Sequence, residues 1–426
     1  MGCTGSSSPM AGPFSDDITY TRPGFHQQYH LRAKLGRGAF AQVHLALKLE
    51  GLGAGEEVAV KISDLRSRMD LKLPTPERLP QDDKKARAAE MEANILRKVD
   101  AHPNIVRIFE DYQEDSFSYI VMERCDRTLL QMLERLPDIK EHALLPILAE
   151  MLVGLVHVHG LSVVHRDIKP DNFLCCGAQN QVKLCDFGLA AVSRGSCDLR
   201  GVYGTAPFMS PEMLGTGGYG AATDIWSFGV IVYVLLLGRF PYQPIESNTK
   251  AMKAAILAGQ PAPTFKLKPG LDASGKAKIS NSATMFLKAL LCRDPAARPV
   301  GREALQHSWM HSQAEPDEPP LRPMLHSAKR SGAFDTRKLP ENSDTDKNSM
   351  DAMLAVLQGR HGKADSPGVV RLPATATARR TDRTTFDSAD AESVLGKAAR
   401  TDSTTEQTTN SSNFTSSSRS NLSAAA

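Results

Sequence analysis

The sequence predicts an α+β fold in two parts, a smaller antiparallel sheet followed by a larger helical part. Strand-like runs rich in β-branched residues occur at 42–49, 57–62 and 116–123. Helical patterns follow the sheet segments at 144–160 and 224–238, and another helical pattern, KKARAAEMEANILRKV, interrupts the strands. A sheet-rich part that precedes a helix-rich part indicates two lobes with a cleft between them.

Composition divides the 426 residues into three zones. Residues 1–28 are rich in Gly, Ser, Pro and Thr and are expected to be disordered, whereas residues 29–310 carry the strand and helix patterns. Residues 311–426 form a polar, Ser/Thr-rich tail, which we expect to be largely disordered because it buries too little apolar surface to offset its ordering entropy. The 51 basic and 48 acidic residues nearly balance, so charge does not favour a nucleic-acid partner.

The cysteines and the apolar runs favour a cytoplasmic chain. Seven cysteines at irregular spacing, without a paired C-x-x-C motif, indicate free thiols in a reducing compartment. No signal peptide is visible in residues 1–30, and the longest apolar run, 229–238, is far short of the ~20 residues that span a bilayer.

Residues 35–43, Leu-Gly-Arg-Gly-Ala-Phe-Ala-Gln-Val, place two glycines between strand-like segments. Glycine lets a backbone approach phosphate oxygens closely and present its N–H groups to them. Taken alone, the segment suits a plain hairpin equally well. It is not a dinucleotide-binding fingerprint, because Ala41 replaces the third glycine and a strand follows.

Lys61 ends the apolar run Val58-Ala-Val-Lys61. An unpaired ammonium at a buried strand end carries a large desolvation cost, so it needs a carboxylate partner. Glu90 and Glu92 on the predicted helix are the candidates. The alternative is that Lys61 simply emerges into solvent.

The segment His165-Arg-Asp-Ile-Lys-Pro-Asp-Asn172 concentrates chemical groups on a loop, since Pro170 disfavours helix there. The carboxylate of Asp167 can accept a proton from a hydroxyl, and Lys169 can neutralise developing negative charge. A second carboxylate, Asp186, ends the next apolar strand. Together with the amide oxygen of Asn172 it offers the oxygen ligands that Mg²⁺ prefers.

In this order, these segments resemble the signature set of the eukaryotic Ser/Thr protein kinases. The resemblance covers about residues 29–310 and implies the bilobal protein kinase fold. It implies transfer of the ATP γ-phosphoryl group to Ser/Thr hydroxyls of protein substrates, with ATP and Mg²⁺ as cofactors. The calcium/calmodulin- and calcium-dependent kinases are most similar, but no EF-hand loop is found, so we expect no direct calcium binding. The nearest segment, Asp344–Met350, lacks the required glycine and glutamate.

The resemblance also implies a role for each residue. Asp167 resembles the catalytic base, Lys169 the lysine that stabilises the phosphate, and Lys61 the lysine that holds the α- and β-phosphates. Glu92 is the implied partner of Lys61 because it stands in the Glu-x-x-Ile-Leu context, with Glu90 as second choice. Asn172 and Asp186 would hold two Mg²⁺ ions. The implied nucleotide-contacting positions are Leu35, Gly36, Arg37, Gly38, Ala39, Phe40, Ala41, Gln42, Val43, Ala59, Lys61, Glu123, Cys125 and Leu174.

Several supporting contacts are implied in the helical part. Glu212 is expected to pair with Arg298, and Asp224 is expected to anchor the backbone of the catalytic loop. Gly204-Thr205, together with Lys169, favours Ser/Thr over Tyr as the acceptor. His307–Met310 resembles the last helix of the domain, and residues 62–86 are expected to form an exposed insert that serves either as a docking loop or as a tolerated surface loop.

The activation segment, Asp186 to Glu212, departs from the family pattern. The resemblance implies that such kinases often need a phosphate to neutralise Arg166, the residue before Asp167. Gly201 stands at the usual phosphothreonine position and cannot be phosphorylated. We therefore expect activation without a phosphate at that site. Two alternatives remain open: Asp198 supplies the charge, or Ser193 and Ser196 are modified.

The N-terminus, Met1-Gly-Cys-Thr-Gly-Ser6, fits the N-myristoylation pattern, with Gly2 as acceptor and Cys3 available for a palmitoyl chain. This predicts a peripheral protein on the cytosolic face of a membrane. In the tail, Met350, Met353, Leu354 and Leu357 form a helical stripe that either docks on a protein or is a chance apolar patch. The alternative function is a pseudokinase scaffold with an interaction tail, which the presence of all four residues Lys61, Asp167, Asn172 and Asp186 disfavours.

Overall fold

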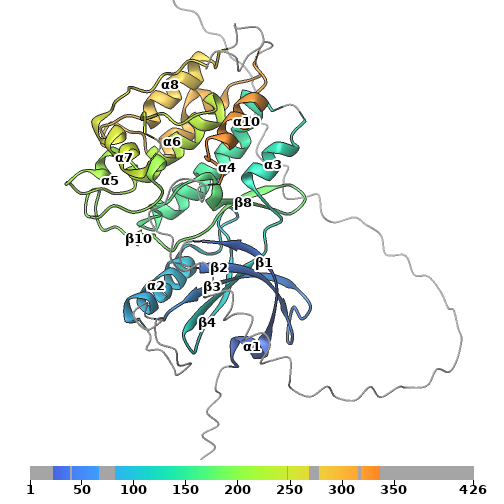
Figure 1. Cartoon of the computed structure of the whole chain (residues 1–426). Coiled ribbons are helices and arrows are strands. Elements are labelled where there is room, and N and C mark those ends of the chain that lie inside the picture. Colours follow the sequence, from blue (N-terminus) through green and yellow to red (C-terminus); the bar gives the residue numbers. More distant parts are fainter. Residues whose placement is uncertain are drawn as a thin grey trace, which may run out of the picture. The chain divides into compact units, whose positions relative to one another are not determined.

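A five-stranded antiparallel sheet forms the first lobe, with strand order β1-β2-β3-β5-β4 (Figure 1). The computed structural model describes residues 23–38, 41–66, 82–137, 139–246, 248–267, 278–314 and 318–335. The strands of this sheet are β1 (Tyr29–Arg37), β2 (Ala41–Lys48), β3 (Glu57–Asp64), β4 (Ile108–Glu114) and β5 (Phe117–Glu123). The predicted runs correspond to β2, β3 and β5, whereas β1 and β4 were not singled out because their alternation is broken by charged residues.

One long helix, α2 (Asp83–Val99), packs against this sheet (Figure 1). The Asp82 side chain caps its first turn by accepting hydrogen bonds from the N–H groups of Lys84 and Lys85. The buried positions recur at helical spacing and include Glu92 among apolar residues. The helix therefore turns one carboxylate inward, toward the sheet.

The second lobe is mainly helical (Figure 1). Its central helix, α6 (Ala222–Leu237), is buried along almost its whole length and ends at Gly238, which adopts the left-handed conformation. This lobe also contains a three-stranded sheet of order β6-β8-β9 and a two-stranded pair of β7 with β10. The elements are α3 (Leu129–Arg135), α4 (Glu141–Gly160), α5 (Pro211–Leu214), α6 (Ala222–Leu237), α7 (Thr249–Ala258), α8 (Asn281–Leu290), α9 (Gly301–Gln306), β6 (Arg127–Thr128), β7 (Val163–Val164), β8 (Phe173–Cys176), β9 (Gln181–Leu184) and β10 (Ala191–Val192), with 3-10 turns η2 (Pro170–Asn172), η3 (Ala206–Phe208) and η4 (Ser308–His311).

The largest hydrophobic core fills the helical lobe and continues into the inner face of α2. Within the described part of the chain, α4 is the one helix that is long and apolar enough to cross a membrane by length and composition. Its contacts with α9 and β9 and its buried leucines explain that composition as core packing. The predicted bilobal fold, a sheet lobe followed by a helical lobe, is confirmed.

The outer face of the sheet has its own core, and it changes the predicted N-terminal boundary. The helix α1 (Phe25–Gln28) brings a fully buried Phe25 against this face. The Phe25 ring stacks on Tyr119, with 4.2 Å between ring centroids. Residues 23–28 are therefore folded, contrary to the expected disorder of 1–28, because one aromatic side chain fills a gap over the sheet. Residues 1–22, including Gly2 and Cys3, lie outside the described residues.

A second correction concerns the C-terminal tail. The helix α10 (Arg322–Arg330) follows η4 and packs against α6. Leu321, Met324, Leu325 and Phe334 are buried in the main core, and Arg322 donates a hydrogen bond to the carbonyl of Glu134. The fold therefore continues beyond the predicted last helix at 307–310. Residues 336–426, with the stripe 350–357 and the segment 344–350, lie outside the described residues.

The predicted insert 62–86 is narrower in the structure. Residues 62–64 belong to β3, and Leu65 and Arg66 are buried. Arg66 pairs with Asp64 and lies over the Phe117 ring, which explains why a polar sequence is packed there. Residues 67–81 lie outside the described residues.

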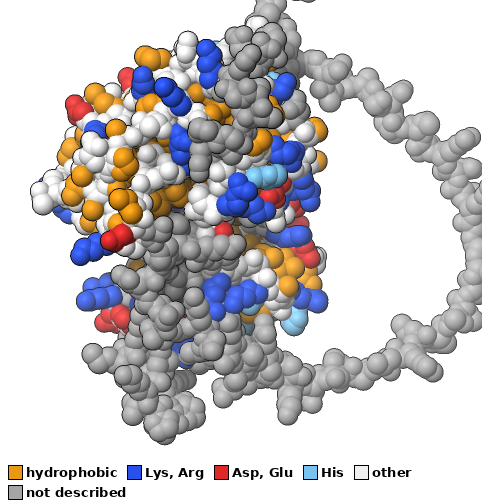
Figure 2. Space-filling view, turned by 45° about the horizontal axis from the view of Figure 1, so that its top comes forward, with side chains coloured by type: hydrophobic (Ala, Val, Ile, Leu, Met, Phe, Trp, Pro, Cys, Tyr) orange, Lys and Arg blue, Asp and Glu red, His pale blue; other side chains and the backbone are white. Residues whose placement is uncertain are grey.

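Charge is spread over the face of the molecule that Figure 2 shows. Lys and Arg side chains are scattered there, with Asp and Glu between them and hydrophobic side chains exposed among both. On this face the described residues form no continuous basic stripe. This distribution agrees with the near-balance of 51 basic and 48 acidic residues in the sequence.

Candidate active site

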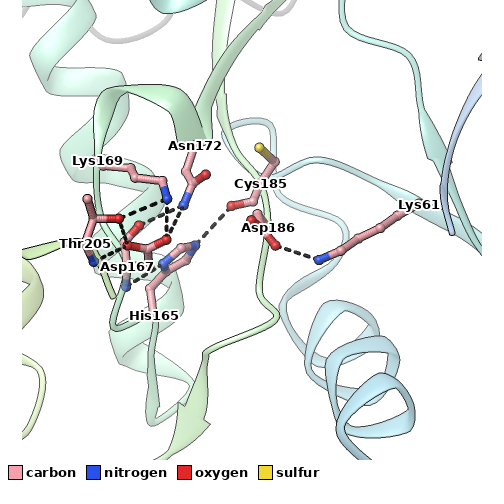
Figure 3. Close-up of polar contacts among 8 residues, drawn as sticks. All are labelled: Lys61, His165, Asp167, Lys169, Asn172, Cys185, Asp186 and Thr205. Atoms are coloured by element: carbon pink, nitrogen blue, oxygen red, sulfur yellow. Dashed lines mark hydrogen bonds and ion pairs between the residues drawn. The ribbon is translucent and has the colours of Figure 1, made fainter. Parts of the chain in front are cut away.

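Lys61 joins the two lobes through a pair of carboxylates. Its ammonium lies 2.6 Å from Glu92 Oε1 on α2 and 2.6 Å from Asp186 Oδ1, which follows β9 (Figure 3 shows the Lys61–Asp186 contact). The expected pair with Glu92 is therefore present, and Glu90 is exposed on the helix instead. A Cβ added at Gly188 would lie 3.3 Å from Lys61 Nζ and from Glu92 Oε2, so glycine leaves room for this cluster.

The two carboxylates in this cluster have opposite pKa shifts. Burial opposes the ammonium form of Lys61, but the carboxylates of Asp186 and Glu92 outweigh it and raise the pKa of Lys61. The Lys61 charge lowers the pKa of Asp186, whereas burial raises the pKa of Glu92. The Asp186 side chain is 46% exposed and that of Glu92 is 6% exposed. Asp186 is thus the ionised, accessible carboxylate, and Glu92 is the buried one.

Asp167 lies at the centre of a second network (Figure 3). Its Oδ1 accepts hydrogen bonds from the backbone N–H of Thr205 at 3.0 Å and from the Thr205 hydroxyl at 2.9 Å. Its Oδ2 pairs with Lys169 Nζ at 2.7 Å, and Lys169 also donates to the Thr205 hydroxyl at 3.1 Å. Burial opposes the charge of Lys169, but the Asp167 carboxylate raises the Lys169 pKa. A carboxylate, an ammonium and a hydroxyl thus converge where an acceptor hydroxyl would be activated.

Asn172 is oriented as a metal ligand would need to be. Its Nδ2 donates to the backbone carbonyl of Asp167 at 2.8 Å, which fixes the amide and leaves the carbonyl oxygen as its acceptor end. The turn Pro170–Asn172 that carries it is a 3-10 helix rather than an α-helix, as Pro170 predicts. With the accessible carboxylate of Asp186, this oxygen fits the hard ligand set of Mg²⁺. No cluster of three or more His, Cys, Asp or Glu side chains suited to a metal occurs among the described residues.

Asp224 anchors the loop that carries Asp167. Its carboxylate accepts hydrogen bonds from the backbone N–H groups of His165 at 2.8 Å and Arg166 at 2.9 Å, as expected. His159 Nε2 lies 2.9 Å from the same carboxylate. Burial opposes the charge of Asp224, but these bonds lower its pKa. Sequence reasoning missed His159, because it stands in no local motif and its partner lies 65 residues away.

His165 connects the two networks. Its Nε2 lies 3.0 Å from the carbonyl oxygen of Cys185, the residue before Asp186, and its Nδ1 accepts the N–H of Asp167 (Figure 3). Burial raises the pKa of the Cys185 thiol well above its usual range, so this side chain stays an uncharged thiol beside the site. The ring of His165 therefore sets the relative position of the two aspartates.

The described residues among the predicted nucleotide-contacting positions lie mainly on the strands β1, β2, β3, β5 and β8. Leu35, Gly36 and Arg37 end β1, and Ala41, Gln42 and Val43 begin β2 opposite them, with Gly38 closing the turn by an N–H bond to the Ala41 carbonyl at 2.8 Å. A Cβ at Gly36 would meet nothing within 4 Å, so space remains beside this backbone. Ala59 lies on β3, Glu123 ends β5 and Leu174 lies on β8. Ala39 and Phe40 lie outside the described residues.

The segment after β5 carries an unexpected crosslink. Cys125 and Cys176 form a disulfide, so the prediction that all seven cysteines are free thiols is wrong for this pair. The cause is the pairing of β6 with β8, in which the Asp126 N–H donates to the Cys175 carbonyl at 3.0 Å and brings the two segments side by side. The other described cysteines, Cys175, Cys185, Cys197 and Cys292, are free.

The activation segment ends on a buried ion pair. Arg298 donates to Glu212 at 2.7 Å and to the carbonyl of Ala222 at 2.6 Å, and its guanidinium lies over the Trp226 ring. The expected Glu212–Arg298 pair is therefore present. It ties α5 to α6 and fixes the end of the segment that begins at Asp186.

The fold and the site together define a bilobal phosphotransferase, with a lysine–glutamate pair in the sheet lobe and a base, an amide and an acidic residue in the helical lobe. Residues 29–310 match the family model described as the protein kinase domain. The chain belongs to the protein kinase family.

Curated relatives place it near the calcium- and calmodulin-dependent group. It is 30% identical over 299 residues to CDPK-related kinase 8 of Arabidopsis thaliana, covering 68% of this chain and 46% of that protein. It is 32% identical over 287 residues to calcium/calmodulin-dependent protein kinase type 1 of Caenorhabditis elegans, covering 67% of this chain and 74% of that protein. The match thus spans about half the length of the CDPK-related kinases.

Proposed function

We propose that this chain transfers the γ-phosphoryl group of ATP to Ser and Thr hydroxyls of protein substrates. The observation that carries the proposal is the meeting of four groups: Lys61 from the sheet lobe lies against Asp186, and Asp167 and Asn172 lie on the neighbouring catalytic loop (Figure 3). Family membership supports it. A scaffold without catalysis would need none of these groups to be held in place.

The proposal gives each residue a task, which the geometry supports. Lys61, held by Glu92, is positioned to bind phosphate oxygens, and the open backbone at Gly36 faces no packing neighbour. Asp167 orients the acceptor hydroxyl and takes its proton, while Lys169 offsets charge on the transferring group. Asn172 and Asp186 would hold Mg²⁺, which neutralises phosphate charge when bound. The Thr205 hydroxyl on Asp167 and Lys169 favours a Ser/Thr rather than a Tyr acceptor.

The test is phosphoryl transfer by the full chain to a positional Ser/Thr peptide library with ATP and Mg²⁺. The proposal expects phosphoserine or phosphothreonine from the wild type and none from Asp186→Ala. A wild type that binds ATP without any transfer, under every lipid and cofactor condition tried, would favour a scaffold.

We propose further that N-terminal acylation holds the enzyme on the cytosolic face of a membrane. The support is the sequence Met1-Gly-Cys-Thr-Gly-Ser6, with Gly2 for a myristoyl and Cys3 for a palmitoyl chain. One myristoyl chain binds membranes with only about 10⁴ M⁻¹, so two chains are required for stable anchoring. Gly2→Ala is expected to move the protein from the membrane fraction to the soluble fraction, and Cys3→Ser to weaken retention. An unchanged membrane fraction in Gly2→Ala would refute acylation as the anchor.

We also expect that the chain binds no calcium directly. The support is the lack of an EF-hand loop in the sequence. Calcium titration of the full chain by calorimetry is expected to give no saturable heat, and a stoichiometric binding isotherm would contradict the expectation.

A further inference from the structure

Arg166, the residue before Asp167, is held by aromatic side chains. Its guanidinium lies over the ring of Tyr203, with 4.2 Å between Cζ and the ring centroid. Its Nε donates to the carbonyl of Leu189 at 2.5 Å, and its side chain also interacts with Tyr219. A cation at this distance over an aromatic face is attracted by the ring quadrupole. The Arg166 side chain thus has its partners in the ring of Tyr203, the carbonyl of Leu189 and the side chain of Tyr219.

The ring at position 203 is two residues from the bonds that reach Asp167. Gly204 lies between, with φ of +90°, and a Cβ there would lie only 2.4 Å from the Arg166 carbonyl oxygen. Thr205 then gives both its N–H and its hydroxyl to Asp167 (Figure 3). The activation segment and the catalytic loop therefore cross in contact. Tyr203 lies on Arg166 at one side of the crossing, and Thr205 bonds to Asp167 at the other. Displacing the ring would loosen the crossing that positions Asp167.

Gly201 makes the ring position possible. It adopts φ of +91°, a conformation that favours glycine, and a Cβ there would lie 2.6 Å from the Tyr203 ring. This is the position at which the family pattern expects a phosphothreonine. A threonine at 201 and the observed placement of Tyr203 are therefore mutually exclusive in this conformation.

Two of the alternatives, Asp198 and Ser193, are engaged with each other at the start of the segment. Asp198 Oδ1 accepts the Ser193 hydroxyl at 2.5 Å, and its Oδ2 accepts the N–H of Arg194 at 2.7 Å. Ser193 is itself buried and also donates to the Gly195 carbonyl. These contacts give Asp198 a role in folding the loop 193–198 back on itself, and they leave the Ser193 hydroxyl poorly placed for modification.

We propose that Tyr203 is a positioning residue whose ring takes the place of an activation-segment phosphate on Arg166, so that the catalytic loop is held in its working arrangement without phosphorylation. The inference rests on the proposed kinase activity. The substrate and the nucleotide do not contact Tyr203 in this scheme, and its effect passes through Arg166 and the 203–205 crossing to Asp167.

The test compares Tyr203→Ala with Tyr203→Phe in the full chain, after protein phosphatase treatment verified by intact mass. A cation–π contact of this kind corresponds to a loss of about 2- to 30-fold. Tyr203→Ala is expected to lose that factor in kcat with the KM for ATP unchanged, and Tyr203→Phe is expected to restore it. Val202→Ala, at a similarly exposed neighbouring side chain, is the matched control and is expected to match the wild type.

A double variant separates positioning from general damage. Arg166→Met and Tyr203→Ala together are expected to be no worse than Arg166→Met alone, because both remove the same contact. Three results would each overturn the inference: loss of wild-type activity on dephosphorylation, full activity in Tyr203→Ala, or additive losses in the double variant. If the wild type showed no phosphoryl transfer at all, the proposed kinase function itself would be overturned, rather than the role of Tyr203.

Discussion

The helix α10 offers a sharp test of where the folded domain ends. Leu325 is 2% exposed and belongs to the main core, so Leu325→Ala removes buried methyl groups and leaves a cavity beside α6. Substitutions of this kind cost about 2–5 kcal/mol of unfolding free energy. On the same helix, Lys329 pairs with Glu134 at 2.6 Å, but its side chain is 55% exposed. An exposed pair is worth about 0–1 kcal/mol, so Lys329→Ala is the matched control.

Urea titration followed by tryptophan fluorescence measures this difference directly. The sequence has two tryptophans, Trp226 and Trp309, and both are fully buried in the helical lobe, so the signal reports on the lobe that α10 covers. We expect Leu325→Ala to unfold at clearly lower urea than the wild type and Lys329→Ala to unfold within error of it. Equal midpoints for the two variants would show that α10 is not part of the core, and the domain boundary would return to about residue 310.

Three further predictions concern the site. Glu92→Gln removes a charged hydrogen bond to Lys61 worth about 1.5–3 kcal/mol, so kcat/KM is expected to fall roughly 10- to 150-fold, while the exposed Glu90→Gln stays within twofold; equal losses would reject the assigned pair. The pKa of Asp224 is lowered on folding, so its contribution to stability is present above its unfolded value of about 3.9 and is lost as pH falls through the folded value. The gap in unfolding free energy between wild type and Asp224→Asn is therefore expected to narrow below about pH 4, and a pH-independent gap would contradict this assignment. Peptide mapping under non-reducing conditions is expected to recover Cys125 crosslinked to Cys176, and two separately alkylated peptides would contradict the disulfide.

The sequence-based prediction succeeded where chemistry is concentrated in short segments. Asp167, Lys169 and Asn172 lie within six residues, and the loop they form needs only Pro170 to exclude an α-helix. The choice of Glu92 over Glu90 followed from the resemblance to the family's Glu-x-x-Ile-Leu context, and the structure agrees: Glu92 is buried, whereas Glu90 is exposed. These are properties of one helix face and one turn.

The prediction failed where packing between distant segments decides. Phe25 and Leu325 lie in polar surroundings in the sequence, and only the cores they fill explain why their segments are folded. The partners Cys125 and Cys176 are 51 residues apart, and strand pairing alone brings them together. The role inferred for Tyr203 likewise depends on the crossing of the activation segment with the catalytic loop, which no local sequence pattern reveals.

The central claim is that the grouped side chains perform phosphoryl transfer, and Asp167→Asn tests it most directly. The amide keeps the shape of the side chain but cannot take a proton, and a general base contributes about 10²- to 10⁴-fold to rate. Single-turnover transfer from ATP by the full chain is expected to slow by that factor, while ATP affinity, measured separately, stays unchanged. Transfer by Asp167→Asn at the wild-type rate would contradict the account.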